Sequence, residues 1–198
     1  MERVPMRRQL SFEEYRGIDL TLFVIILGIA ETLIVRAATG WFADQLYTVS
    51  VVGAVTAIVL MRWNAFALIH AVLGAVFFCF ASHGTWQQYL IYGLGNLFSL
   101  LMLLPLKKLG SEKIRNDSFL SVCFGLGTLL LMQIGRAAVA LVFGHSLSAC
   151  LGFITTDVLS LLFTGVVIWI ARRLDGVFEN QKHYLLRIHN AEEEKGGY

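Results

Sequence analysis

The sequence predicts an all-α integral membrane protein, a bundle of six transmembrane helices with both termini in the cytoplasm and a cytoplasmic amphipathic helix at the C-terminus. Three observations predict it. Of the 198 residues, 57% are hydrophobic and only 15% are charged, against about 25% charged in an ordinary soluble domain. The apolar residues form long continuous runs, which is typical of spanning helices and not of a membrane barrel. The basic residues lie almost entirely outside those runs.

Six apolar runs have the length of a spanning helix, about 20 residues with a range of about 17–25. The first contains Glu31 and Arg36 and is too long for the apolar region of a signal peptide, so we expect it to be retained. The second and third are the shortest, and only Arg62 and Trp63 separate them. In chain order the runs are Asp19–Ala38, Gln45–Met61, Asn64–Ala81, Trp86–Leu106, Phe119–Phe143 and Ala149–Ala171.

Lysine and arginine gather on one side of the predicted membrane. Four lie before the first run, one between the second and third, four between the fourth and fifth, and five in the tail after the sixth. The other three loops contain none. Because basic loops stay in the cytoplasm, this asymmetry places both termini there and predicts a multi-pass protein of the plasma membrane.

The two flanks of the bundle also carry helical patterns. Ser11 and Glu14 have the spacing of a capping box, which predicts a helical turn leading into the first span. In the tail, apolar residues recur at helical spacing from Leu174 to Ile188 among basic residues. We expect an amphipathic helix within 172–198 that lies on the membrane face or against a cytoplasmic partner. The alternative is a basic flank of the last span without a partner.

Composition and motifs exclude several function classes. The formal net charge of +2 is too small to indicate a nucleic-acid partner. Cys79, Cys123 and Cys150 are odd in number and lack the spacing of a metal site, so we expect buried small hydrophobic residues. The sequence has no Gly-x-Ser-x-Gly elbow, His-Glu-x-x-His helix or Walker A loop. We therefore expect no catalytic residues, no enzyme activity, no metal and no cofactor.

Polar residues inside the predicted spans are candidates for a binding site. A charge at the centre of a spanning helix costs about 2.5–3.5 kcal/mol on insertion scales, so such a residue needs a partner, a cavity or a path to the interface. At about 1.5 Å of rise per residue, these side chains converge on the outer half of the bilayer. They are the charged residues Glu31, Arg36, Arg136 and Asp157 and the neutral residues Asn96 and Gln133.

These residues predict a solute pocket that opens outward. Arg136 is expected to pair with Glu31 or Asp157, and two guanidinium groups would suit a carboxylate or another anion. Trp86 and Tyr92, near the outer ends of the helices, could close over a flat ring. The alternatives are that Arg36 reaches the outer interface and that the aromatic side chains belong to an interfacial belt.

Small residues recur every four positions on the first three predicted helices, as Gly53 and Ala57 do on the second. Ala67, Ala71 and Ala75 do so on the third, and Gly28 and Thr32 on the first. Such faces allow the backbones of two helices to approach closely. They predict either packing within the bundle or a docking face for another membrane subunit.

The chain resembles the substrate-binding S components of energy-coupling factor (ECF) transporters. The likeness lies in its length, its six expected helices with both ends inside, and the stretches Arg62–Gly74 and Tyr89–Asn96. Members commonly carry Ala-x-x-x-Ala on the first helix, where this chain has Gly28-x-x-x-Thr32. The resemblance implies capture of a small vitamin-like solute, anionic or aromatic, from the outer face. The implied partners are a transmembrane coupling protein and two cytoplasmic ATPases.

Two other functions remain open from the sequence. One is a self-contained secondary carrier or channel that acts as an oligomer; inverted repeats would favour it, and the two halves of the sequence show none. The other is an accessory membrane subunit of a different complex, docked through its small-residue faces and its tail.

Overall fold

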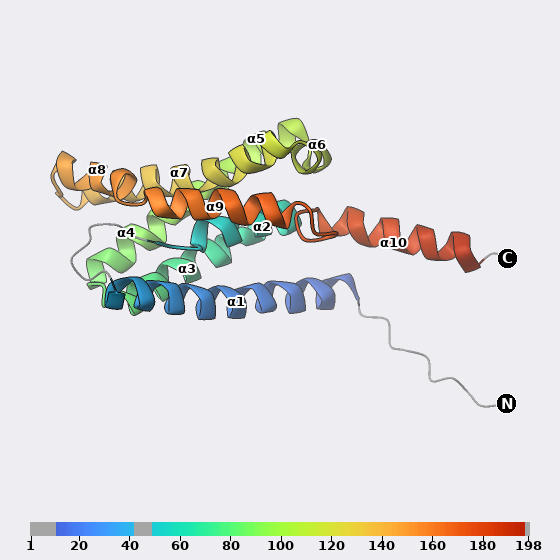
Figure 1. Cartoon of the computed structure of the whole chain (residues 1–198), viewed down its shortest axis with the longest axis horizontal. Coiled ribbons are helices and arrows are strands. Elements are labelled where there is room, and N and C mark those ends of the chain that lie inside the picture. The colour runs from blue at the N-terminus through green and yellow to red at the C-terminus, as the bar shows by residue number, and fades with distance from the viewer. Residues whose placement is uncertain (1–10, 42–48, 197–198) are drawn as a thin grey trace, which may run out of the picture.

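The computed structural model describes residues 11–41 and 49–196, and all of the regular secondary structure in these residues is helical. The helices lie roughly along one long axis (Figure 1). The α-helices are α1 Phe12–Trp41, α2 Val52–Trp63, α3 Ala67–Ala81, α4 Trp86–Asn96, α5 Leu103–Leu109, α6 Ser111–Asn116, α7 Ser118–Val142, α8 Leu147–Thr155, α9 Val158–Ala171 and α10 Gln181–Gly196, and the 3₁₀ turns are η1 Asn64–Phe66 and η2 Leu97–Met102. The predicted all-α fold class is confirmed for this part of the chain.

Five helical stretches of the described chain are long and apolar enough to cross a membrane. Large apolar side chains point outward along them, as Ile18, Ile29 and Leu33 do on α1, with 57%, 58% and 65% of their surface exposed. An outer surface of this kind is compatible with a multi-pass membrane protein. The five stretches are Phe12–Trp41, Val52–Ala81, Trp86–Leu109, Ser118–Val142 and Leu147–Ala171.

Four of the predicted runs correspond to these stretches. α1 contains the first run and begins at the predicted capping box, in which the Glu14 N–H donates to Ser11 Oγ at 3.2 Å. α4, η2 and α5 follow one another without interruption over the fourth run. α7 matches the fifth run to within one residue at each end. The sixth run is divided between α8 and α9, which are separated by Thr156 and Asp157.

The second stretch, Val52–Ala81, folds back on itself. Asn64, between α2 and α3, has a positive φ of +52°, which is uncommon for any residue other than glycine and breaks the helical path. A Cβ atom on Gly74 of α3 would lie 2.5 Å from Val52 Cγ1 at the start of α2. A continuous helix would hold these two residues about 33 Å apart. α2 and α3 are therefore antiparallel neighbours (Figure 1).

α2 differs from the span that the sequence predicts over Gln45–Met61. The helix begins only at Val52, and residues 45–48 of the predicted span lie outside the described residues. Its 12 residues rise about 18 Å, against the roughly 30 Å of a bilayer core. All 12 are buried, so protein and not lipid surrounds this helix.

The two ends of the bundle are distinct in Figure 1. α1 begins and α9 ends at one of them, here called the α10 end, where α6 also lies. The opposite end, here called the α8 end, holds the end of α7 and the start of α4. α10 runs away from the bundle, roughly along its long axis (Figure 1).

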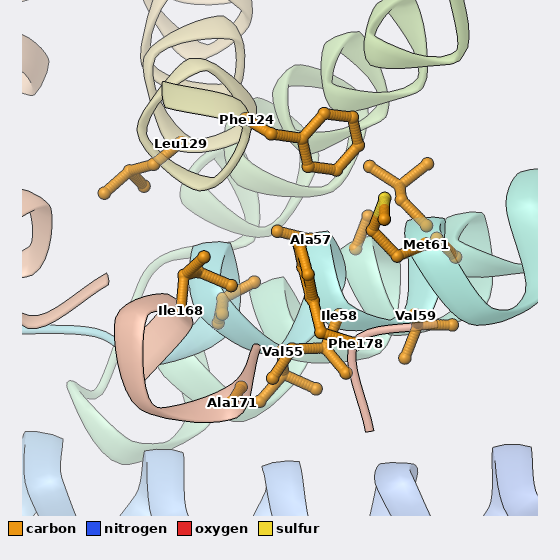
Figure 2. Packing of buried hydrophobic residues seen from close by; sticks show 14 of the residues in the cluster. Val55, Ala57, Ile58, Val59, Met61, Phe124, Leu129, Ile168, Ala171 and Phe178 are labelled. Atoms are coloured by element: carbon orange, nitrogen blue, oxygen red, sulfur yellow. The ribbon is translucent and has the colours of Figure 1, made fainter. Parts of the chain in front are cut away.

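The segment 172–180 is where the predicted tail is wrong. It forms turns and not the beginning of an amphipathic helix, which starts only at Gln181. Gly176, with φ +70°, interrupts the helical path. Phe178 has none of its surface exposed and packs edge-on against Phe124 of α7, with ring centroids 6.3 Å apart. Figure 2 shows it among apolar side chains of α2, α7 and α9.

Arg62 fastens this segment to the bundle. Its Nε and Nη2 atoms donate to the two carboxylate oxygens of Asp19 at 2.9 and 2.6 Å, and Nη1 donates to the carbonyls of Gly176 and Val177. The Trp63 indole N–H donates to Asp19 at 2.5 Å. Because Arg62 and Asp19 are almost fully buried, this contact joins α1, α2 and the chain after α9 at the α10 end.

Candidate binding site

Arg136 is the centre of a buried polar group between α4, α7 and α9. Its Nε donates to Asn96 Oδ1 at 2.8 Å, and its Nη1 lies 3.5 Å from Asp157 Oδ2. Gln133 Nε2 donates to the same Asp157 oxygen at 3.0 Å. All four side chains are at most 4% exposed. We call Asn96, Gln133, Arg136 and Asp157 the interior polar cluster.

Two glycines bring α4 and α7 into the contact that forms this cluster. A Cβ atom on Gly135 would overlap the carbonyl oxygen of Gly95, and one on Gly95 would lie 2.5 Å from the backbone nitrogen of Arg136. The two backbones therefore touch. Asn96 and Arg136, each the next residue after one of these glycines, are held within hydrogen-bonding distance as a result.

Asp157 occupies the interruption between α8 and α9. As the residue before α9, it has the position from which an aspartate usually accepts hydrogen bonds from the first turn of the helix. Its side chain caps no N–H there and turns instead to Gln133 and Arg136. The predicted pairing of Arg136 with Asp157 is therefore present. Arg136 lies six residues before the end of α7, so the interior polar cluster is nearer to the α8 end.

Glu31 joins this region through the segment that precedes α2. Its side chain is fully buried, and Oε2 accepts the Val51 N–H at 2.8 Å. The neighbouring Ser50 N–H donates to Ser160 Oγ at 2.9 Å, one turn after Asp157 on α9. The charges of Arg136 and Asp157 act on the Glu31 carboxyl. Segment 50–51 thus links Glu31 on α1 to the α9 side of the cluster.

Tyr92 packs on the cluster but offers little of its ring. Arg136 Cζ lies 4.5 Å from the ring centroid, and Phe78 stacks on the same ring at 4.8 Å with an interplanar angle of 17°. Phe153 meets it at a steep angle. With a guanidinium and a stacked ring both at contact distance, Tyr92 holds Arg136 in position and has no free face for an aromatic solute.

Arg36 and Trp86 lie apart from the other predicted site residues. Arg36 is exposed, and its Nη1 donates to His83 Nε2 at 3.0 Å. Trp86 is 66% exposed and contacts Phe143 edge-on. Both are at the α8 end of their helices, where Arg36 can reach an interface as the alternative interpretation expects. The predicted pair of guanidinium groups is therefore wrong, because only Arg136 enters the cluster.

The predicted docking residues serve contacts within the bundle. Ala67, Ala71 and Ala75 are at most 1% exposed, so the alanine run is not an exposed docking face. Asn96 Nδ2 donates to the Ala71 carbonyl at 2.9 Å, which this small residue leaves accessible. On α1, Gly28 packs against Phe77 of α3, and Thr32 is half-buried.

Sequence reasoning did not find the hydroxyl groups near the cluster. Ser50 and Ser160 join the start of α2 to α9. The hydroxyls of Thr56 and Thr164 are buried and have no hydrogen-bond partner in the structure. Hydroxyl residues in apolar runs give a weak signal because they often bond to their own helix, as Thr128 does to the Phe124 carbonyl.

The region combines buried polar groups with apolar surroundings. It contains hydrogen-bond donors and acceptors of both charges, enclosed by apolar side chains, as small-molecule sites do. Among residues 11–41 and 49–196, no group of three or more His, Cys, Asp or Glu side chains is placed to hold a metal ion. No known family model matches the sequence, and no curated protein or solved structure matches it either.

Proposed function

We propose that this protein is the membrane-embedded substrate-capture subunit of an ECF-type importer, which binds a small vitamin-like solute from the outer face. In this proposal the chain crosses the plasma membrane six times, the segment that contains α2 being the second crossing and α3 the third, and both termini are cytoplasmic. The single observation that carries it is the interior polar cluster, buried in a bundle whose outer surface is apolar.

The cost of the cluster supports a function beyond folding. An ion pair buried in a protein gains little over well-packed apolar side chains of similar size. Ionisable residues inside membrane spans are expensive, and they commonly mark solute or ion pathways. Arg136 and Asp157 are such a pair, so binding is a better explanation of their presence than stability.

The irregular backbone beside the cluster supports the same conclusion. Segment 49–51 is not helical, and the N–H groups of Ser50 and Val51 are satisfied by the side chains of Ser160 and Glu31. A second interruption lies at Asp157. At membrane depth, backbone of this kind is tolerated where it is buried in protein or lines a cavity. Interrupted helices also form the solute sites of many transporters.

The energy for transport would come from partners, because the sequence has no Walker A loop. In this proposal a transmembrane coupling protein contacts the helices within the bilayer, and two cytoplasmic ATPases act at the α10 end. α10 extends from the bundle at that end and is available to them (Figure 1).

Co-purification tests the proposed partners. We would tag the C-terminus, purify the protein gently from its own host and identify the accompanying proteins by mass spectrometry. We expect two ATPases and a second integral membrane protein in constant ratio to the bait. Recovery with an unrelated enzyme complex would contradict the proposal and favour an accessory subunit.

A self-contained secondary carrier is the second candidate. The interrupted helices beside the cluster favour it, because such carriers bind solutes at similar interruptions. It predicts that liposomes containing this protein alone accumulate the solute in response to an ion gradient. The capture-subunit proposal predicts binding without accumulation in the same liposomes.

A further inference from the structure

We infer that the solute presents a positively charged nitrogen, as in a protonated amine or an amidinium-like ring, and that Glu31 is the residue that receives it. This inference rests on the proposed function and specifies its solute. It reverses the anionic preference that the sequence suggests from Arg36 and Arg136, and three observations about the buried polar atoms carry it.

The first observation is which atoms have no partner. Glu31 Oε1 and Gln133 Oε1 are buried side-chain oxygens with no hydrogen bond in the structure. Both are acceptors. The amide orientation of Gln133 is set by its neighbour, because a carboxylate can only accept and Nε2 must therefore face Asp157. Gln133 Oε1 is left to accept an N–H from elsewhere.

The second observation is that the one guanidinium of the cluster is already engaged. Arg136 donates to Asn96 through Nε, lies 3.5 Å from Asp157 through Nη1 and stacks on Tyr92. An anionic solute would have to compete with Asp157 for this group. Arg36, the other candidate for an anion, is exposed and bonded to His83.

The third observation is the charge count of the buried groups. Among these buried side chains Arg136 is the one guanidinium, whereas Asp157 and Glu31 are two carboxyl groups. In the part of the chain that the structure describes, Glu31 forms no ion pair, and the groups that bond its carboxyl are neutral: the Val51 N–H and the Ser50 side chain. An uncompensated carboxylate is costly inside a membrane protein, and a cationic solute would balance it.

Glu31 and Gln133 are the two ends of one series of contacts. Glu31 binds Val51, the adjacent Ser50 binds Ser160, and one turn away Asp157 binds Gln133. A small solute beside segment 50–51 could thus place its charged nitrogen on Glu31 Oε1 and a second N–H on Gln133 Oε1. This pairing makes a donor-rich cation the class of solute that the site fits.

A thermal-shift assay with a charge-sorted mixture tests the inference. The probe is yeast extract separated by ion exchange into cationic, neutral and anionic small-molecule fractions. The melting temperature of the purified full-length protein is followed by the fluorescence of its four tryptophans. We expect the cationic fraction alone to raise it. Glu31→Gln, which keeps an acceptor for the Val51 N–H, should need an at least tenfold higher concentration of that fraction, because a hydrogen bond to a charged group is lost.

Controls separate the inference from the proposed function. Glu112→Gln, at an exposed carboxyl of α6, should respond as wild type. If Glu31→Gln fails to fold, two other variants replace it. Glu31→Asp keeps the charge and Gln133→Met removes Oε1. Only Gln133→Met should then need a markedly higher concentration of the cationic fraction. If the anionic or neutral fraction stabilised the wild-type protein, or if Glu31→Gln responded to the cationic fraction as the wild type does, the inference would be overturned and solute capture would stand. No response to any fraction would count against solute capture itself.

Discussion

At the scale of single residues, Asp157 and Arg136 raise the question of whether a buried pair stabilises the fold or binds a solute. Their separation of 3.5 Å is long for an ion pair, and each has a second partner in Gln133 or Asn96. A pair of this kind gains little over apolar substitutes, whereas removing one member leaves the other charge without its counter-ion. Stability and binding should therefore respond differently to single and double substitutions.

Asp157→Asn should lower the free energy of unfolding by about 3–5 kcal/mol, because Arg136 keeps its charge and loses its carboxylate. The double variant Arg136→Met with Asp157→Asn should recover much of that loss, since neither charge is then buried. Thermal unfolding in detergent measures both. A double variant that is less stable than the single one would contradict this account of the pair.

Gly135 is a residue at which a single methyl group should disturb the site. In Gly135→Ala the new Cβ would overlap the Gly95 carbonyl, so α4 and α7 must move apart and Asn96 must leave Arg136. We expect a loss of about 1–3 kcal/mol in unfolding free energy, which is typical of overpacking. Gly93→Ala is the matched control because nothing lies within 4 Å of its Cβ position. Equal melting temperatures for the two variants would refute the close contact.

At the scale of elements, the short buried helix α2 depends on its fastening at the α10 end. Arg62 is its next-to-last residue and joins it to α1 through Asp19 and to segment 172–180 through backbone carbonyls. Phe178 lies in the core beside it only while that segment stays folded against the bundle. Release of Arg62 should therefore loosen the chain after α9 as well as α2.

Arg62→Ala should destabilise the protein by about 3 kcal/mol or more, because it leaves Asp19 buried without its partner. It should also make residues 172–180 sensitive to protease, which limited proteolysis with mass spectrometry would detect. Glu13→Gln is the control, because it breaks the exposed Glu13–Arg16 pair, and such pairs contribute less than about 1 kcal/mol. Protection of 172–180 in Arg62→Ala would argue against this fastening.

The sequence is most informative where one continuous apolar run forms one long helix. Both ends of α7 lie within one residue of the predicted limits, because a long continuous apolar run can form few structures other than a single helix. α2 is shorter than predicted because protein surrounds it, and a buried helix needs no fixed length. The spacing of Phe178 from its apolar neighbours in the sequence is that of an amphipathic helix, yet in the structure it is a core residue. The position of Phe178 depends on the turn at Gly176 and on contacts with Arg62, which is distant in the sequence. A local pattern of apolar residues cannot predict such contacts.

The part of the candidate site that could be predicted is the part that depends only on the depth of each residue in the membrane. Asn96, Gln133, Arg136 and Asp157 are predicted at similar depths, and the structure brings them together. Predicted depth did not distinguish Arg36 from these residues. Arg36 lies five residues after Glu31 on α1, so its side chain points in another direction and lies closer to the α8 end. The hydroxyl groups of α2 and α9 gave too weak a signal.

At the scale of the whole molecule, the proposed topology makes the two ends of the bundle differ in accessibility. Cys79, Cys123 and Cys150 are first replaced by alanine, and single cysteines are then introduced at the exposed positions Ser148 and Lys113. In intact cells a membrane-impermeant maleimide should label Ser148→Cys and should label Lys113→Cys only after lysis. The opposite pattern would reverse the orientation, and labelling of both positions in intact cells would refute the single crossing, by α7, that separates them.

The central claim is that the interior polar cluster holds a small molecule. Native mass spectrometry of the intact protein, released from detergent after gentle purification from its host, tests this most directly. We predict that the wild-type protein carries a reproducible small-molecule adduct and that the double variant Arg136→Met with Asp157→Asn, equally folded by thermal unfolding, lacks it. An adduct of the same mass and occupancy on both proteins, or none on either, would contradict the claim.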